Sequence, residues 1–230
     1  MFFSMASNAK DGDAAKLSEA KFTVTPSAVE LSASEEERLR TLGLERRSGA
    51  PGLYLMRARN RMGNDEPVEP AEEIKLEGEL KVKAERLRDE LAAHLKEKGT
   101  EGLPKDLDGK SDLMGAWLSG ADLAEAQLQK ADLRKAQLQE AQIQSAQLQK
   151  ANLRGAKLEK ADLSEAQLQK ADLSRAQLQE ANLRNAQLQK ANLREAQLQK
   201  ANLTGAQLQK ANLIEAQLQE ARPVDAHLQE

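Results

Sequence analysis

From Ser111 to Glu230 the sequence repeats every five residues without a break. The 24 consecutive pentapeptides begin with alanine in all but the first, and their third residue is leucine in all but two, which carry Ile143 and Pro223. Repeated units bury their apolar side chains mainly against their neighbours. A period this regular therefore constrains the fold before any other feature of the chain does.

A period of five predicts a coil of short extended segments rather than a helix. In an α-helix, leucines five residues apart would be rotated by about 140° from one another and would line no single face. In an extended Ala-x-Leu segment, the first and third side chains share one face, and two turning residues then restart the pattern. The sequence thus predicts a parallel β-solenoid with alanine and leucine inside. Its predicted core includes Leu123, Leu128, Leu133, Leu138, Leu148, Leu168 and Leu188.

The tandem Ala-(Asp/Asn)-Leu-x-x units resemble those of the pentapeptide-repeat proteins. The resemblance implies a mainly β fold, a right-handed quadrilateral parallel β-helix with four pentapeptides in each coil. The repeat would then make about six coils, in a rod roughly 29 Å long at about 4.8 Å between neighbouring strands. We assign residues 105–230 to this domain.

The residues before the repeat divide into two predicted segments. Residues 1–69 are interpreted as a largely disordered or weakly structured arm with one short helix. Ser34 followed by Glu37 is typical of a capping box at the start of that helix, and Gly43 suits its end. Residues 70–104 are interpreted as a capping α-helix and a linker.

The predicted capping helix runs from about Ala71 to Lys98 and ends at Gly99. Its apolar residues recur every three or four positions, so they form one stripe that needs a partner. Two partners are open: the end of the solenoid, which we favour, or a second copy of the helix in a coiled coil. The expected cap contacts are Leu87, Leu91, Leu95 and Trp117.

The composition argues against an enzyme. The chain has no cysteine, and its two histidines, His94 and His227, lie far apart in the sequence. No metalloprotease, phosphate-loop, nucleophile-elbow or kinase motif occurs. We therefore predict no catalytic residue, no cofactor and no metal site. No apolar run is long enough for a membrane span, and the first residues do not fit a secretory signal, so we expect an intracellular, cytoplasmic protein.

With four pentapeptides per coil, residues twenty apart stack into columns. Glutamines fill two columns of one face, which predicts amide ladders or, alternatively, a binding face. The same face is edged by a column of five lysines, which we call the lysine ladder: Lys130, Lys150, Lys170, Lys190 and Lys210. The ladder is a candidate docking site for a polyanion or an acidic partner, and we expect Asp132 and Asp172 to neutralise part of its charge. On the opposite face, the matching column alternates in sign, with Glu140, Lys160 and Glu180.

The favoured function is a non-enzymatic scaffold that presents rigid polar ladders to a protein partner. A nucleic-acid-associated protein is the alternative, through the lysine ladder or through a basic segment in which Tyr54 could stack on a base. Some pentapeptide-repeat proteins mimic DNA and bind type II topoisomerases, but 15 acidic and 15 basic residues make residues 111–230 neutral. A further alternative is a homo-oligomer through the C-terminal edge. The basic segment contains Arg46, Arg47, Arg57, Arg59 and Arg61.

Overall fold

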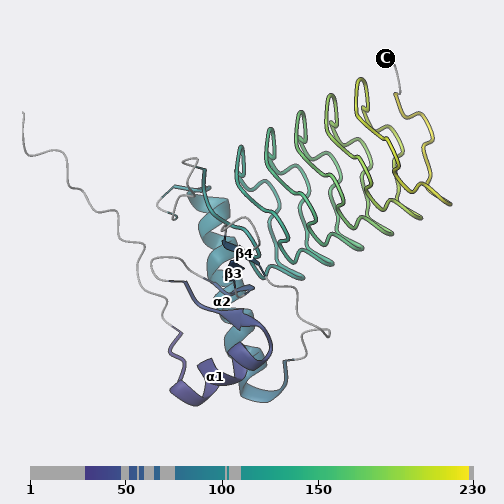
Figure 1. Cartoon of the computed structure of the whole chain (residues 1–230). Coiled ribbons are helices and arrows are strands. Elements are labelled where there is room, and N and C mark those ends of the chain that lie inside the picture. Colours follow the sequence, from purple (N-terminus) through teal and green to yellow (C-terminus); the bar gives the residue numbers. More distant parts are fainter. Residues whose placement is uncertain are drawn as a thin grey trace, which may run out of the picture.

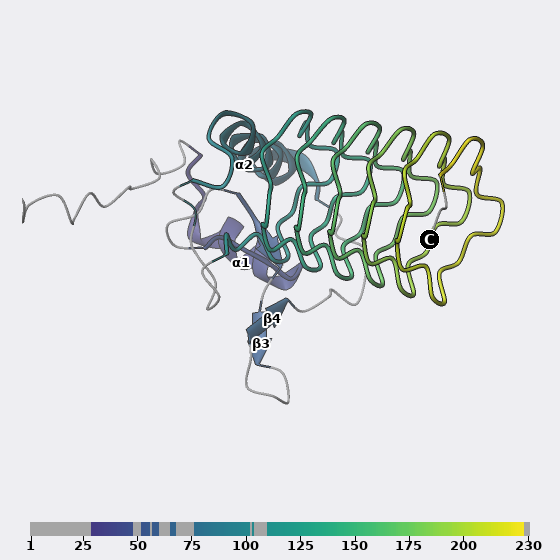
Figure 2. The same cartoon turned by 90° about the horizontal axis from the view of Figure 1, so that it is seen from above.

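The computed structural model describes most of the chain, and within it the repeat forms a stack of coils that leads away from a helical N-terminal part (Figures 1 and 2). Of the predicted weakly structured arm, residues 1–69, only part is described, and residues 1–28 lie outside the described residues. The described residues are 29–47, 52–55, 57–59, 65–67, 76–101, 103 and 110–227.

Each coil of the repeat is twenty residues long. Parallel bridges join residues twenty apart, from Asp112 with Asp132 to Gln207 with His227. Four pentapeptides therefore make one turn of the solenoid, as the resemblance implies. The bridges are single residues at the second position of each pentapeptide, and no longer strand is formed in 110–227.

Backbone hydrogen bonds connect every coil to both neighbours. The second residue of a pentapeptide donates backward and the third donates forward, so Gln147 N–H bonds Ala126 O at 2.9 Å and Leu148 N–H bonds Gln167 O at 2.8 Å. These bonds occupy the backbone groups of the short extended segments, which would otherwise be left without partners inside the stack. The coils are thereby held in one register.

The fifth residue of each pentapeptide turns the corner in a left-handed conformation. At Lys150 φ is +61°, and the leucine before it accepts a bond from the next alanine, Ala151 N–H to Leu148 O at 3.0 Å. In this four-residue turn, Leu148 to Ala151, Lys150 is the third residue. A positive φ at that place alone is typical of a type II turn, which favours glycine or asparagine there. Nineteen non-glycine residues occupy such conformations, all of them at this fifth position. Each costs about 1–2 kcal/mol, which the burial of one leucine, at about 1.5–3 kcal/mol, offsets.

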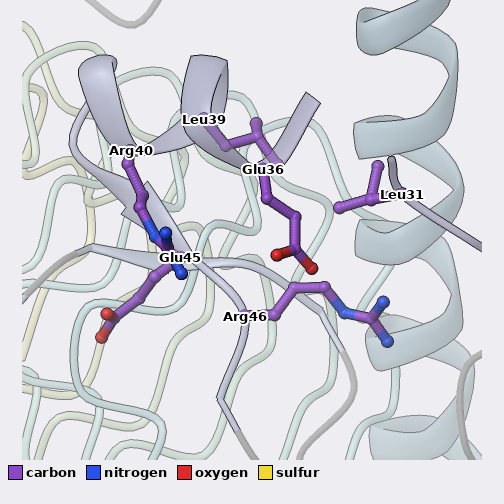
Figure 3. A pocket seen from close by; sticks show the side chains of 6 residues that line it. All are labelled: Leu31, Glu36, Leu39, Arg40, Glu45 and Arg46. Carbon is purple, nitrogen blue, oxygen red and sulfur yellow. The ribbon is translucent and has the colours of Figure 1, made fainter. Parts of the chain in front are cut away.

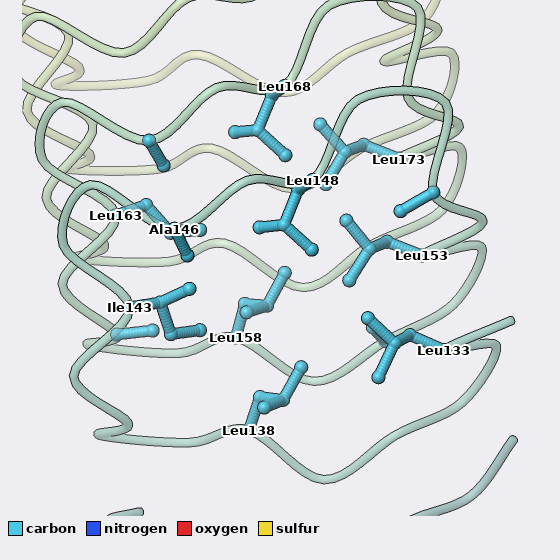
Figure 4. Packing of buried hydrophobic residues seen from close by; sticks show 14 of the residues in the cluster. Leu133, Leu138, Ile143, Ala146, Leu148, Leu153, Leu158, Leu163, Leu168 and Leu173 are labelled. Atoms are coloured by element: carbon cyan, nitrogen blue, oxygen red, sulfur yellow. The ribbon is translucent and has the colours of Figure 1, made fainter. Parts of the chain in front are cut away.

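Alanine and leucine fill the interior from Leu113 to Leu208, all of them at most 4% exposed (Figure 4). Leucines twenty apart stack in columns, such as Leu133 beneath Leu153 and Leu173. In the last described coil Leu218 is 40% exposed, and Pro223 is exposed as well. The predicted core leucines are each at most 2% exposed: Leu123, Leu128, Leu133, Leu138, Leu148, Leu168 and Leu188.

Helix α1 (Ala33–Thr41) is the short helix predicted in the N-terminal segment, but its capping box was misplaced by two residues. Ser32 Oγ accepts the N–H of Glu35 at 3.3 Å, and Glu35 Oε2 accepts the N–H of Ser32 at 2.8 Å. Ser34 and Glu37 have the same spacing but lie inside the helix. Gly43, at φ +79°, follows the helix end as expected.

Glu35 should make the free energy of unfolding depend on pH in the acidic range. The hydrogen bonds from Ser32 and from the Lys83 ammonium lower the pKa of Glu35 from 4.5 to about 2. A carboxylate with a depressed pKa stabilises the fold fully above its unfolded-state pKa and loses that contribution as the pH falls. Between pH 4.5 and 2 the wild type should therefore lose more stability than Glu35→Gln. Urea denaturation followed by Trp117 fluorescence measures this, and equal losses in the two proteins would contradict it.

Two small antiparallel pairs follow α1, and neither was predicted. β1 (Leu44–Glu45) pairs with β2 (Tyr54–Leu55), and β3 (Arg57–Arg59) pairs with β4 (Asp65–Pro67). The free edge of β2 meets the first coil, where Trp117 N–H bonds Leu53 O at 2.8 Å. This segment therefore supplies an acceptor that a preceding coil would otherwise provide.

Helix α2 (Gly78–Glu97) lies across the first coil (Figure 2). It begins at Gly78, later than predicted, and Gly99 follows its end at φ +59°. Leu91 and Leu95 join the core cluster of the solenoid. The other expected cap contacts belong to a second cluster built with α1, β1 and β2: Leu87 is one of its buried members, and Trp117 packs against it.

The packing of α2 leaves no room for a side chain at Gly52. A Cβ there would lie 2.8 Å from Leu91 Cδ2, whereas a Cβ at Gly78 would meet nothing within 4 Å. Both glycines have positive φ, so alanine strains the backbone similarly at each. Gly52→Ala should therefore lower the free energy of unfolding clearly more than Gly78→Ala, whose cost is about 1 kcal/mol. Equal urea midpoints for the two variants would contradict this packing.

Candidate interaction face

Two hollows lie on the surface of the described part of the chain. One hollow of about 80 Å³ lies between α1 and β1, lined by Leu39, Arg40 and Glu45 among others, and holds only a few waters (Figure 3). A second, open groove of about 560 Å³ runs between Lys96 and the first coils. No group of three or more metal-ligating side chains occurs among the described residues.

The open groove has one clear polar contact. Lys96 Nζ donates to Asp122 Oδ2 at 2.8 Å, and this bond lowers the pKa of the Asp122 carboxyl. The contact ties α2 to the first coil. His94 Nε2 lies 2.9 Å from Glu101 O, while His227 is exposed at the far end of the rod.

In the basic N-terminal segment, Arg47 and Tyr54 are both engaged in contacts within the fold. Arg47 forms an ion pair with Asp112 at 3.5 Å, and its guanidinium covers the Tyr54 ring at 4.1 Å. Tyr54 is fully buried, so it cannot stack on a base. Arg57 and Arg59 lie in β3, and Arg61 falls outside the described residues. Arg47 and Tyr54 therefore join the N-terminal part to the first coil.

The Asp/Asn faces of the solenoid use their side chains to hold the turns. Asp162 Oδ1 accepts the N–H of Ser164 at 3.0 Å and the Nδ2 of Asn182, one coil on, at 2.9 Å. Burial raises the pKa of Asp162, but these hydrogen bonds and others together hold it below its usual range. A carboxylate or amide one carbon from the backbone can reach this N–H, which explains the preference for Asp and Asn at the second position.

The glutamine faces form ladders, but not along the predicted columns. The amide at the fourth position donates to the amide at the second position of the next coil, eighteen residues on, as in Gln179 Nε2 to Gln197 Oε1 at 2.5 Å. The bonds therefore run diagonally and link two columns. The same bond joins Gln129 to Gln147, Gln149 to Gln167, Gln169 to Gln187, Gln189 to Gln207, and Gln199 to Gln217.

The lysine ladder is exposed along the whole rod. Within residues 110–227, none of its five ammonium groups forms a hydrogen bond or an ion pair. The neutralisation expected from Asp132 does not occur, because Asp132 is 2% exposed and its Oδ2 pairs with Arg134 Nη2 at 2.6 Å. Asp172 accepts from Ser174 and Asn192 instead. The charges of the ladder are therefore not neutralised by ion pairs within residues 110–227.

The opposite corner carries charges of alternating sign. Glu140, Lys160, Glu180 and Lys200 are all exposed, and among the described residues they form no ion pair within 4.0 Å of one another. Their attraction along the column is therefore weak and screened by solvent. Of these two corners, only the lysine ladder carries charges of a single sign.

A sequence model described as pentapeptide repeats (8 copies) matches residues 111–148, 146–185 and 186–222. Among curated proteins, no relative matches the chain. Among solved structures, the chain is 36% identical to alr5209, a pentapeptide-repeat protein from Nostoc PCC 7120. The match covers 54% of this chain and 78% of that one, with a TM-score of 0.19.

Two further solved structures are similar to the repeat. HetL, a pentapeptide-repeat protein involved in heterocyst differentiation regulation in Nostoc sp. strain PCC 7120, is 36% identical over 50% of this chain, with a TM-score of 0.37. Rfr23 from Cyanothece 51142 is 34% identical over 45% of this chain, with a TM-score of 0.24. The chain spans 63% of the length of HetL and 64% of that of Rfr23.

Proposed function

The chain belongs to the pentapeptide-repeat family, and on that premise we propose that it is a non-enzymatic scaffold that presents its polar faces to a protein partner. The observation that carries the proposal is the contrast between occupied and free side chains. Asp, Asn and Gln bond within and between coils, whereas the five ladder lysines have no partner in the described part of the chain. The longest column of unpaired charges of one sign is thus the lysine ladder.

Affinity in such a scaffold comes from number and rigidity. An exposed ion pair contributes only about 0.2–1 kcal/mol, so a single lysine would not bind a partner stably. Five lysines on a backbone fixed by inter-coil hydrogen bonds act together, and the rod loses little conformational entropy when it binds. An acidic protein surface is the partner that this arrangement favours.

We also infer that α2 and β2 cap the solenoid. Leu91 and Leu95 cover the core at the first coil, and β2 pairs with the edge of that coil. Without them the first coil would expose apolar side chains and open hydrogen-bonding groups, which favour aggregation. The cap would therefore direct partners to the sides of the rod.

Affinity purification of the tagged full-length chain from its own cells tests the proposal. We expect a partner protein to be retained in stoichiometric amount. Its retention should not change on nuclease treatment and should be lost at high salt. A retained fraction that nuclease removes would instead support the nucleic-acid alternative. Retention of no protein at low salt would contradict the scaffold.

Within residues 29–101, no described helix is both long enough and apolar enough to span a bilayer. A cytoplasmic location remains part of the proposal and fits a chain without cysteine. Cell fractionation would test it.

Topoisomerase binding by DNA mimicry is less well supported. Duplex DNA carries one negative charge per 1.7 Å, so a mimic of about 29 Å needs roughly 17 net charges. The repeat balances 15 acidic against 15 basic residues. Inhibition of gyrase supercoiling by the purified chain would reverse this judgement, and light scattering over a range of concentrations would test the homo-oligomer.

A further inference from the structure

A second row of cations runs beside the lysine ladder, on the next pentapeptide of each coil. Together the two rows make what we call the basic face, with ten Lys and Arg against four Asp and Glu, a net charge of +6. Because the whole repeat is neutral, the rest of it carries −6, and the rod is polarised across its width. The basic face comprises residues 130–135, 150–155, 170–175, 190–195 and 210–215; its second row contains Arg134, Lys135, Arg154, Arg175 and Arg194.

The floor between the two rows is low and uncharged over much of its length. It is made by the short Asp and Asn side chains at the second position, which bond the backbone beneath them. Asn152 Oδ1 accepts the N–H of Arg154 at 3.2 Å, and Asn192 Oδ1 accepts that of Arg194 at 3.2 Å. Long cationic side chains therefore flank a strip of short side chains that follows the rod.

The width of this strip suits an α-helix. The two rows are four or five residues apart along the chain, so their backbones are separated by at most about 14–18 Å. A helix with its side chains is about 10–12 Å across. A helix on the strip would have cationic side chains on each flank.

The spacing of the coils along the strip also suits a helix. Coils follow one another at about 4.8 Å, and turns of an α-helix at about 5.4 Å. Over the five lysines the mismatch accumulates to only about 2.4 Å, which the flexible stems of lysine absorb. Carboxylates spaced three and four residues apart on a helix can thus each meet a ladder lysine.

We propose, on the basis of the scaffold function above, that the basic face binds an acidic α-helix of the protein partner, laid along the rod. The side chains that receive it are those left free by the fold. Arg154 and the lysine ladder are exposed and form no side-chain bond in residues 110–227. Arg175 and Arg194 lie 2.7 and 3.1 Å from Glu195, and these pairs are partly exposed, so a partner carboxylate can replace Glu195. Arg134 pairs with Asp132 and Lys135 donates to the Pro67 carbonyl at 3.3 Å, so the second row offers fewer free charges than the ladder.

A DNA duplex fits the same face less well. The ladder is straight and about 19 Å long, whereas a duplex completes a turn in about 34–36 Å. Over the length of the ladder each phosphate strand therefore winds through more than half a turn and leaves the plane of the lysines. Only part of the ladder could contact one strand at a time.

The test uses the full-length chain and a fluorescein-labelled alanine-based peptide with Glu at alternating three- and four-residue spacings. A second peptide of the same charge, interrupted by two prolines, removes the helix, and a DNA duplex serves as the third probe. The basic-face variant is Lys150→Gln/Lys170→Gln/Lys190→Gln. The matched control variant, Lys157→Gln/Lys160→Gln/Lys200→Gln, removes three lysines elsewhere on the rod.

Fluorescence anisotropy at fixed salt should show that the wild type binds the helical peptide at least about tenfold more tightly than the proline-interrupted one. The basic-face variant should lose about tenfold or more in affinity for the helical peptide, and the control variant about twofold or less. Equal binding of both peptides, tighter binding of the duplex, or equal losses in the two variants would overturn the proposal. Retention of a protein partner by the basic-face variant would leave the scaffold intact and reject only this site.

Discussion

Lys170→Pro is expected to disrupt the middle of the rod, although the Lys170 side chain is exposed and forms no ion pair with any described residue. Its φ is +60°, whereas the proline ring fixes φ near −65°. Its N–H also bonds Gln189 O at 3.0 Å, and proline has no N–H to offer. We expect a loss of about 3 kcal/mol or more in the free energy of unfolding.

The control for this prediction is Lys170→Gly, which keeps the N–H and adopts a positive φ freely. Relief of backbone strain and the greater freedom of the unfolded chain oppose each other, so the change should stay within about 1 kcal/mol. Urea denaturation followed by circular dichroism measures both variants. A proline variant with the midpoint of the wild type would show that the fifth residue does not need its left-handed turn.

Leu168→Ala is expected to have the second large effect. Leu168 is fully buried between coils, so its truncation leaves a cavity that neighbours on a fixed backbone cannot fill. Such changes cost about 2–5 kcal/mol. Leu218→Ala removes the same atoms at a position that is 40% exposed, and should cost less than half as much.

The comparison of these two leucines tests the stacking order of the rod. Both occupy the third position of a Gln-type pentapeptide, so local sequence does not distinguish them. Only the coils above and below make their surroundings differ. Equal shifts of the urea midpoint in the two variants would contradict the arrangement of coils described above.

The period of five was sufficient to predict the solenoid and its core. Ala and Leu at fixed positions state directly which side chains face inward, and a twenty-residue coil follows from the family resemblance. The left-handed fifth residue was not predicted. Lys, Glu and Arg dominate that position and favour no such turn, so the signal was the presence there of Asn185 and of four glycines, Gly115, Gly120, Gly155 and Gly205.

The candidate face was predicted only in part. The lysine ladder could be predicted because its lysines occupy one column of the repeat. The second row lies on the next pentapeptide and is spread over two positions, with Arg154 at the fourth and Arg175 at the fifth. When each column is considered alone, the net positive charge that the two rows share on one face of the neutral rod is not seen. The diagonal glutamine bonds were missed for a similar reason, because they join two columns rather than follow one.

The N-terminal part was the least predictable. Leu44, Leu53 and Leu55 are fully buried, yet they lie on or next to two-residue strands that have no recognisable period. Arg47 belongs to a sequence that resembles a solvated basic loop, and its role became visible only beside Asp112 of the first coil. Contacts over such distances in sequence are set by tertiary packing rather than by local pattern.

The most direct test of the central claim, that the lysine ladder is the free and partner-binding charge of this rod, is lysine acetylation footprinting by mass spectrometry. The full-length chain is labelled alone and in complex with the protein that it retains. We predict fast labelling of Lys150, Lys170 and Lys190 in the free chain and strong protection of these three in the complex, with Lys160 and Lys200 unchanged. Protection of Lys160 and Lys200 instead, or no protection of the ladder, would contradict the account.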